Sequence, residues 1–148
     1  MQQVIIQLTA IVDEYVALLN NIPGDVFEQK AAPDKWSKKE IIGHLIDSAQ
    51  NNIQRFVRAQ YQDKPLIVYD QDAWVAASNY QAYDRQSLIQ LWQLLNKHIC
   101  IILANMPKQM YAREVNIGRA EQQLVTVQFL ADDYITHHLH HIKQIFNN

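Results

Sequence analysis

The sequence SKKEIIGHLIDSAQNNIQRF, residues 37–56, predicts a long helix whose start is well defined. Ser37 and Glu40 have the spacing of a capping box, in which each side chain accepts a hydrogen bond from the backbone N–H of the other residue. Apolar residues then recur at helical spacing until about Tyr61. The row predicted to face the core consists of Ile42, Leu45, Ile46, Ala49, Ile53 and Phe56.

Three more helices are predicted on either side of this one. They span about Gln3–Asn20, Arg85–Asn105 and Val125–Phe146. The first ends before a Pro-Gly pair and the second before Met106-Pro107, both of which interrupt helices. In the helix at 85–105, the row expected to face the core is Leu88, Leu91, Leu95, His98 and Ile102. Residues 63–83 and 111–123 lack one clear period and are predicted to be loops, with a short helix near 72–78.

The composition favours an all-α protein that forms a single domain over residues 1–148. The 148 residues include 3 glycines and 4 prolines, which leaves few turns for a many-stranded sheet. Hydrophobic residues make up 49% of the chain, enough for a sizeable core. Four helices joined by one short turn and two longer connections therefore predict a four-helix bundle.

Charge and hydropathy argue against two kinds of partner. Thirteen basic and fifteen acidic residues give a formal net charge of -2, without a basic block that neutralises phosphates, so no nucleic-acid partner is expected. The longest apolar stretches, such as residues 99–104, are far shorter than the ~20 residues that cross a bilayer. The N-terminus lacks the basic start of a secretory signal. We therefore expect a soluble, cytoplasmic protein with no membrane partner.

Four of the six histidines lie within THHLHHIKQI, residues 136–145. His137 and His141 are four residues apart, so on a helix their imidazoles lie on one side and can share a metal ion. A catalytic zinc-type site normally takes three protein ligands, and His44 is a candidate because it lies opposite the apolar row of its helix. Asp47 and Asp133 lie within helical reach of these histidines and are expected to orient them. The competing interpretation is that both polar rows are ordinary solvated helix faces.

Three motifs together resemble the DinB-like superfamily, which includes YfiT-type metal-dependent enzymes and thiol-dependent transferases and is unrelated to the DNA polymerase of the same name. The motifs are Trp36-Ser37 leading into Glu40-Ile-Ile-Gly-His44-Leu, Asp72-Ala-Trp74 with Tyr80 downstream, and His137-His-Leu-His-His141-Ile-Lys-Gln144-Ile145. Their order and separation agree with the family plan over nearly the whole chain. The resemblance implies an up-down-down-up bundle that commonly forms homodimers.

The same resemblance implies that a divalent metal ion is held by His44, His137 and His141. Within so dense a cluster the assignment can slip: pairing His138 with His141 is the main alternative, and His140 is another candidate. Three imidazoles suit zinc, nickel, iron or copper alike, so the metal cannot be named from the ligands.

The implied function is that of a divalent-metal-dependent enzyme acting on a small-molecule substrate. The first expectation is a transferase that uses a metal-activated low-molecular-weight thiol, and the second is hydrolysis by metal-bound water. Ser48, Asn51 and Arg55 share the polar row of His44 and are candidates for contacting a carboxylate or the thiol cofactor. No general base or nucleophile stands out. The competing class is a non-enzymatic dimeric helical module with an incidental or degenerate metal site.

Overall fold

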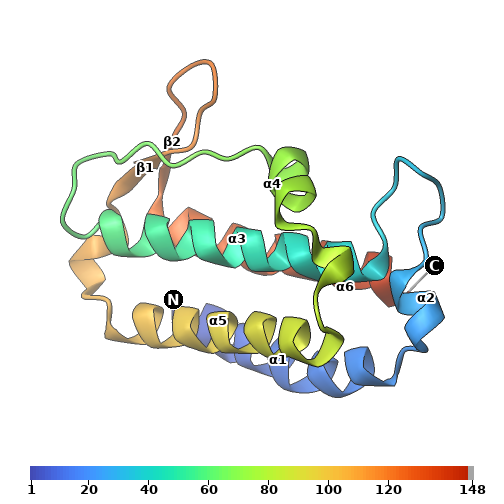
Figure 1. Ribbon diagram of the computed structural model, residues 1–148. Coiled ribbons are helices and arrows are strands. Elements are labelled where there is room, and N and C mark those ends of the chain that lie inside the picture. The colour runs from blue at the N-terminus through green and yellow to red at the C-terminus, as the bar shows by residue number, and fades with distance from the viewer. Residues whose placement is uncertain (147–148) are drawn as a thin grey trace.

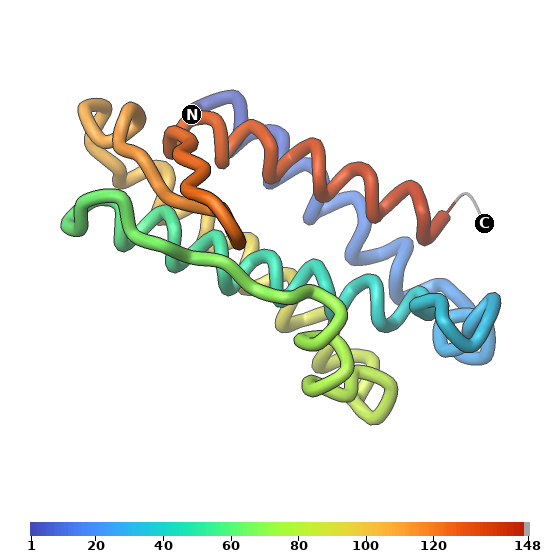
Figure 2. Tube along the Cα trace, turned by 90° about the horizontal axis from the view of Figure 1, so that it is seen from above, coloured from blue at the N-terminus to red at the C-terminus, as the bar shows by residue number. Residues whose placement is uncertain are grey.

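A computed structural model describes residues 1–146, in which four long helices form a bundle. The long helices are α1 (Gln2–Asn21), α3 (Lys38–Arg58), α5 (Arg85–Asn105) and α6 (Val127–Phe146). Figure 1 and Figure 2 show that α1 and α6 run in one direction and α3 and α5 in the other. Each of α1 and α3 packs against both α5 and α6. The predicted four-helix bundle with up-down-down-up topology is therefore confirmed.

Helix α3 begins where the sequence predicted and is more deeply buried than one apolar row implies. The backbone N–H of Ser37 donates to Glu40 Oε2 at 2.8 Å, and that of Glu40 donates to Ser37 Oγ at 3.1 Å, which completes the capping box. Besides the long helices, α3 contacts the short elements α2 (Gly24–Glu28), α4 (Gln71–Ser78) and the 3-10 turn η1 (Tyr80–Ala82). Because neighbours cover it on several sides, its polar residues are buried together with its apolar ones. These polar residues are Lys39, Glu40, His44, Asp47, Ser48, Asn51 and Asn52.

The face of α5 that meets the core differs from the predicted row. The bounds of the helix agree with the prediction, but His98 is exposed, so its predicted place in the core was wrong. The buried residues instead include Trp92 and Asn96, one turn apart. Asn96 is tolerated because its amide accepts a hydrogen bond from Tyr134 at 2.7 Å and donates one to the Trp92 carbonyl at 2.7 Å. The full buried set of α5 is Leu88, Ile89, Trp92, Asn96, Ile99 and Leu103.

A small β-hairpin, which the sequence did not predict, precedes α6. Strands β1 (Glu114–Asn116) and β2 (Leu124–Thr126) pair antiparallel after the 3-10 turn η2 (Lys108–Met110). The backbone of Asn116 also exchanges hydrogen bonds with the connection after α3, donating to Pro65 O and accepting from Ile67 N. Hairpin and connection therefore lie side by side along α3, as Figure 2 shows.

Helices α1 and α5 have apolar residues on more than their core faces. Both are long enough to cross a bilayer, and each has a mean hydropathy of 1.2 in its most apolar window, although core helices of globular proteins satisfy the same criteria. Each contributes buried residues to the bundle, and each exposes large apolar side chains, including Ile6 on α1 and Leu94 and Ile101 on α5. The expected homodimer and the expected absence of a membrane partner stay predictions.

Candidate metal centre

Helices α3 and α6 bring three histidines together that are far apart in the sequence. His44 lies fully buried on α3, and its ring centroid is 5.1 Å from that of His137 and 4.6 Å from that of His141. The Nε2 atoms of His44 and His137 are 3.1 Å apart. Nitrogen atoms that bind one tetrahedral ion at about 2.0–2.1 Å lie about 3.3 Å from each other, which matches this spacing. One nitrogen from each ring lies within 4.8 Å of the others, so this three-histidine cluster could hold a metal ion.

The protein environment keeps the three imidazoles neutral. Burial, together with a smaller effect of the neighbouring histidines, lowers the pKa of His44 to about 3 and that of His137 to about 4. Burial also lowers the pKa of His141. A metal ligand must offer an imidazole lone pair, and these rings offer theirs at neutral pH without first losing a proton.

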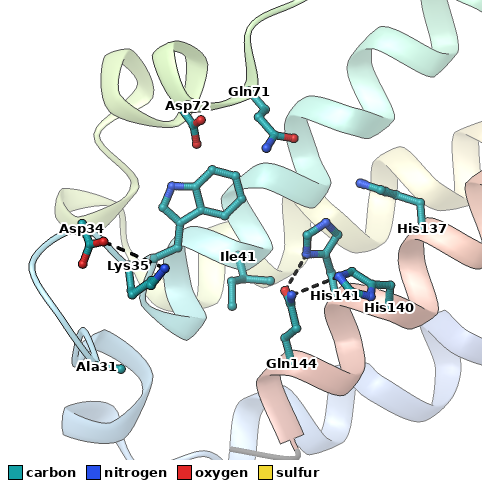
Figure 3. A pocket seen from close by; sticks show the side chains of 11 residues that line it. Ala31, Asp34, Lys35, Ile41, Gln71, Asp72, His137, His140, His141 and Gln144 are labelled. Carbon is teal, nitrogen blue, oxygen red and sulfur yellow. Dashed lines mark hydrogen bonds and ion pairs between the residues drawn. The ribbon is translucent and has the colours of Figure 1, made fainter.

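Gln144, which the sequence analysis did not single out as functional, orients one of the three rings. His141 Nδ1 lies 2.8 Å from Gln144 Oε1, and because that oxygen only accepts, Nδ1 carries the proton and Nε2 keeps its lone pair. The other end of the amide donates to His140 Nε2 at 3.0 Å. Figure 3 shows the three side chains linked in this way at the end of α6. Metal-binding histidines are usually oriented by such a hydrogen bond from the second ring nitrogen.

The prediction that Asp47 and Asp133 orient the rings of His44 and His137 was wrong. The Nδ1 atoms of both rings are buried and have no hydrogen-bond partner among residues 1–146. Asp47 is instead the acceptor of the Tyr80 hydroxyl, and Asp133 is exposed. The spacing along each helix predicted that these carboxylates lie near the histidines, but it did not determine the direction of their side chains.

His138 belongs to the core rather than to the cluster. Its side chain is fully buried, and its Nε2 accepts a hydrogen bond from Trp92 Nε1 at 2.9 Å. The alternative ligand pair of His138 and His141 would require the Trp92 hydrogen bond to break or the ring to turn. His140 is exposed and hydrogen-bonded to Gln144.

A cavity of about 750 Å³ opens in front of the cluster. His137 and His141 form part of its wall, to which Trp36 and Ile41 contribute apolar surface. Figure 3 shows Ile41 and the two histidines around this space. The ring of Trp36 lies 4.9 Å from that of His44, so it also covers the third histidine. The remaining lining residues are Ala31, Asp34, Lys35, Gln71, Asp72, His140 and Gln144. This size and mixture of polar and apolar groups suit a small organic molecule.

The three residues predicted to contact a cofactor are only partly grouped. Ser48 and Arg55 line a small cavity of about 90 Å³ that also reaches His137. Asn51 does not line it, because its amide donates to the Asp47 carbonyl at 2.9 Å, and Asn52 takes that place. Whether Ser48, Asn51 and Arg55 contact a bound group stays a prediction.

A buried pair beside the cluster connects η1 to α3. The Tyr80 hydroxyl donates to Asp47 Oδ1, while Asp47 Oδ2 has no partner among the described residues. The tyrosine ring fits there because residue 43 is glycine: a Cβ at Gly43 would lie 2.1 Å from Tyr80 Cδ2. Burial raises the pKa of Asp47 to about 6, and the Tyr80 hydrogen bond opposes this rise.

Replacing Tyr80 by phenylalanine is expected to destabilise the protein more at high pH than at low pH. At pH 8 Asp47 is ionised, and losing a donor to a buried carboxylate costs about 1.5–3 kcal/mol. The folded-state pKa of Asp47, about 6, exceeds its ordinary value of 3.8, so folding favours the protonated form and the cost of the ionised form disappears as the pH falls through 6. At pH 5 the expected loss is about 1 kcal/mol. Urea unfolding in the presence of a chelator measures both values.

The matched control for this prediction is the same substitution in an Asp47→Asn background. There the loss caused by Tyr80→Phe should not depend on pH, since no carboxylate remains at the site. Equal losses at pH 5 and pH 8 in the Asp47 protein would contradict the assignment.

Comparison with known proteins shows which family the sequence matches. Residues 7–145 match the DinB superfamily. Two relatives, YfiT of Bacillus subtilis and BH0277 of Halalkalibacterium halodurans, are each named "Putative metal-dependent hydrolase". The chain is 25% identical to YfiT over 111 residues and 27% identical to BH0277 over 117 residues. These matches cover 74% and 75% of the chain but 62% and 66% of the relatives, less than two thirds of either.

Solved structures share the fold. The YfiT structure, described as an unusual four-helix bundle topology, matches with a TM-score of 0.89 at 20% identity, covering 99% of this chain and 83% of that one. A mycothiol-dependent maleylpyruvate isomerase matches with a TM-score of 0.75 at 11% identity, covering 95% and 59%. Because the family match extends over almost all of the described residues, the chain belongs to the DinB superfamily.

Proposed function

We propose that this protein is a divalent-metal-dependent enzyme, in which His44, His137 and His141 hold the ion and the 750 Å³ cavity receives a small-molecule substrate. The observation that carries the proposal is the cluster of three neutral imidazoles, two of which, those of His137 and His141, form part of the cavity wall. His138, which lies outside the cluster, uses its Nε2 atom to accept a hydrogen bond from Trp92. The Nε2 atoms of His44 and His137 lie 3.1 Å apart, which is close to the spacing of two ligands on one ion, so a cation there would be bound by the lone pairs of both rings.

His44, His137 and His141 would hold the divalent ion, which would supply Lewis-acid chemistry and would lower the pKa of a water or thiol bound to it. The chain's own residues prepare the site for this chemistry. Gln144 keeps the Nε2 lone pair of His141 available, while Trp36 and Ile41 limit the water around the reacting groups. Lys35 and Gln71 offer hydrogen-bond donors on the cavity wall for orienting a substrate.

Hydrolysis is the first candidate reaction, which reverses the order expected from the sequence. The reason is that YfiT and BH0277, the two sequence relatives, are both named for metal-dependent hydrolysis. Transfer involving a low-molecular-weight thiol is the second candidate, because the fold is shared with a mycothiol-dependent isomerase. The cytoplasmic location and the homodimer remain predictions.

Activity is expected to depend on the metal in one of two assays. Untagged protein is stripped with a chelator and reloaded separately with zinc, nickel or iron(II). Each form is tested for hydrolysis of aryl esters and anilides, and for conjugation of a chlorodinitrobenzene electrophile to cysteine or glutathione. Turnover that appears on reloading and is absent from His44→Ala supports the proposal, and the assay in which it appears selects the reaction. Equal turnover in stripped and reloaded protein would contradict the mechanism.

A further inference from the structure

Arg55 carries a positive charge that no described residue neutralises directly. This half-buried guanidinium on α3 donates to the Ile67 carbonyl at 3.1 Å and to Asn52 Oδ1 at 3.4 Å, both of which are uncharged acceptors. No carboxylate among residues 1–146 forms an ion pair with it, although Asp133 acts on it at longer range. Burial lowers the pKa of Arg55, as expected for a cation without a close counter-ion. Since a partly buried charge without a close counter-ion is unfavourable, the position favours binding an external anion.

A second arginine faces the same space from the hairpin. Arg55 and Arg119 both line a cavity of about 190 Å³, and no acidic residue lines it. Arg119 donates to the Tyr69 carbonyl at 2.7 Å, which holds its side chain against the connection after α3. The remaining lining residues are Val68, Tyr69, Gln71 and Ile117. Two arginines and no acidic residue therefore line one small cavity.

The turn of the hairpin is shaped to place Arg119. Asn116 Oδ1 accepts hydrogen bonds from the backbone of Gly118 at 3.1 Å and of Gln123 at 3.0 Å, which closes the turn. A Cβ at Gly118 would lie 1.7 Å from the Glu121 carbonyl oxygen, so this tight closure requires glycine. The hairpin, which lies beside the connection after α3 in Figure 2, thus brings the positive charge of Arg119 to that connection.

This charged cavity adjoins the space around the histidines in two places. Gln71 lines both the 190 Å³ cavity and the 750 Å³ cavity, at whose edge it is labelled in Figure 3. Arg55 and Tyr69 also line the 90 Å³ cavity, whose wall includes His137. A molecule with an anionic end near the arginines can therefore direct its other end toward the histidine cluster.

We propose that the cavity between Arg55 and Arg119 is an anion subsite for a substrate carboxylate, so that the protein acts on small carboxylic acids. A guanidinium offers two parallel N–H donors that match the two oxygens of a carboxylate. The inference rests on the proposed function for the reacting end of the substrate. The anion subsite itself requires no metal and is testable without it.

The test measures binding of succinate to chelator-treated protein by NMR titration, with succinamide as its uncharged counterpart. Succinate should shift the resonances of residues around 67–71 and 117–119, and succinamide should bind at least about tenfold more weakly. Arg119→Gln, on an exposed turn, should weaken succinate binding about tenfold. Arg55→Lys should also weaken it, because the lysine ammonium cannot offer the two parallel N–H donors of a guanidinium. Arg58→Gln is the matched control: it removes a charge from the same helix, lies outside these cavities and should leave the dissociation constant unchanged.

Several outcomes would overturn the inference. Equal binding of succinate and succinamide removes the need for an anion subsite, and unchanged binding by both Arg119→Gln and Arg55→Lys places the subsite elsewhere. Binding of inorganic phosphate in an Arg119-dependent manner, without succinate binding, would refute the carboxylate assignment. His44→Ala separates this inference from the proposed function: it should lose metal and still bind succinate. Succinate binding without turnover by any metal-loaded form would contradict the proposed enzymatic function but not the anion subsite.

Discussion

Replacing His44 by alanine is expected to reduce the bound metal from about one equivalent per chain to nearly none. Two histidines one turn apart on α6 remain in the variant, and two ligands bind a divalent ion far more weakly than three. Loss of a single outer-shell partner already costs 10–100-fold in metal affinity, so loss of a ligand should cost more than about 100-fold. Elemental analysis of untagged protein, after loading with zinc, nickel or iron(II) and gel filtration, measures the effect.

The other histidines of α6 supply the comparison for this experiment. His137→Ala and His141→Ala should match His44→Ala, because each removes one member of the cluster. His140→Ala is the matched control, since it deletes a neighbouring exposed imidazole that lies outside the cluster, and it should retain nearly all of the metal. No metal in the loaded parent protein, or equal losses in all four variants, would refute the three-histidine site.

The substitution Gly43→Ala is expected to lower the free energy of unfolding by about 2 kcal/mol or more. In an uncrowded helix the same change would raise it by about 0.8–1 kcal/mol, because alanine has the higher helix propensity. At this position, however, the new Cβ would lie 2.1 Å from Tyr80 Cδ2, and that ring is buried and hydrogen-bonded to Asp47. The helix or η1 must therefore shift. Urea unfolding of metal-free protein measures the difference.

Two controls make the sign of this effect informative. In a Tyr80→Ala background, Gly43→Ala should become neutral or stabilising, because the obstructing ring is gone. Gly24→Ala, where a new Cβ meets no atom within 4 Å, should not destabilise the protein, and because Gly24 is the first residue of α2 any gain should be small. A Gly43→Ala protein that is more stable than the parent would show that Tyr80 does not pack against α3 as described.

The histidine cluster illustrates that helix packing, and not helix formation alone, brings the residues of a candidate site together in a bundle. His44 contributes because α3 is covered by other elements on several sides, so a histidine opposite the apolar row is buried rather than solvated. The same burial makes each polar group on α3 depend on a partner from elsewhere in the chain. Asp47 accepts a hydrogen bond from Tyr80, and the Nε2 atoms of His44 and His137 lie 3.1 Å from each other.

Local sequence determined the helices. The Ser37 capping box and the Pro107 that follows α5 set boundaries through backbone hydrogen bonding within a few residues, which is why they could be predicted closely. The spacing of His137 and His141 placed both rings on one side of α6 for the same local reason. The assignment of His44 as their partner came from a polar row and a family resemblance, and its metal role stays a prediction.

Tertiary packing decided what local patterns left open. Helix α5 has apolar residues on more than one arc, and its contacts with α1 and α3 select the arc with Trp92 and Asn96 over the one with His98. The hairpin that carries Arg119 has strands of three residues, too short to produce a recognisable alternation. The direction in which a polar side chain points depends on which neighbour is within hydrogen-bonding distance. Asp47, for example, points toward Tyr80. Such contacts join residues far apart in the chain, and periodicity within one helix carries no information about them.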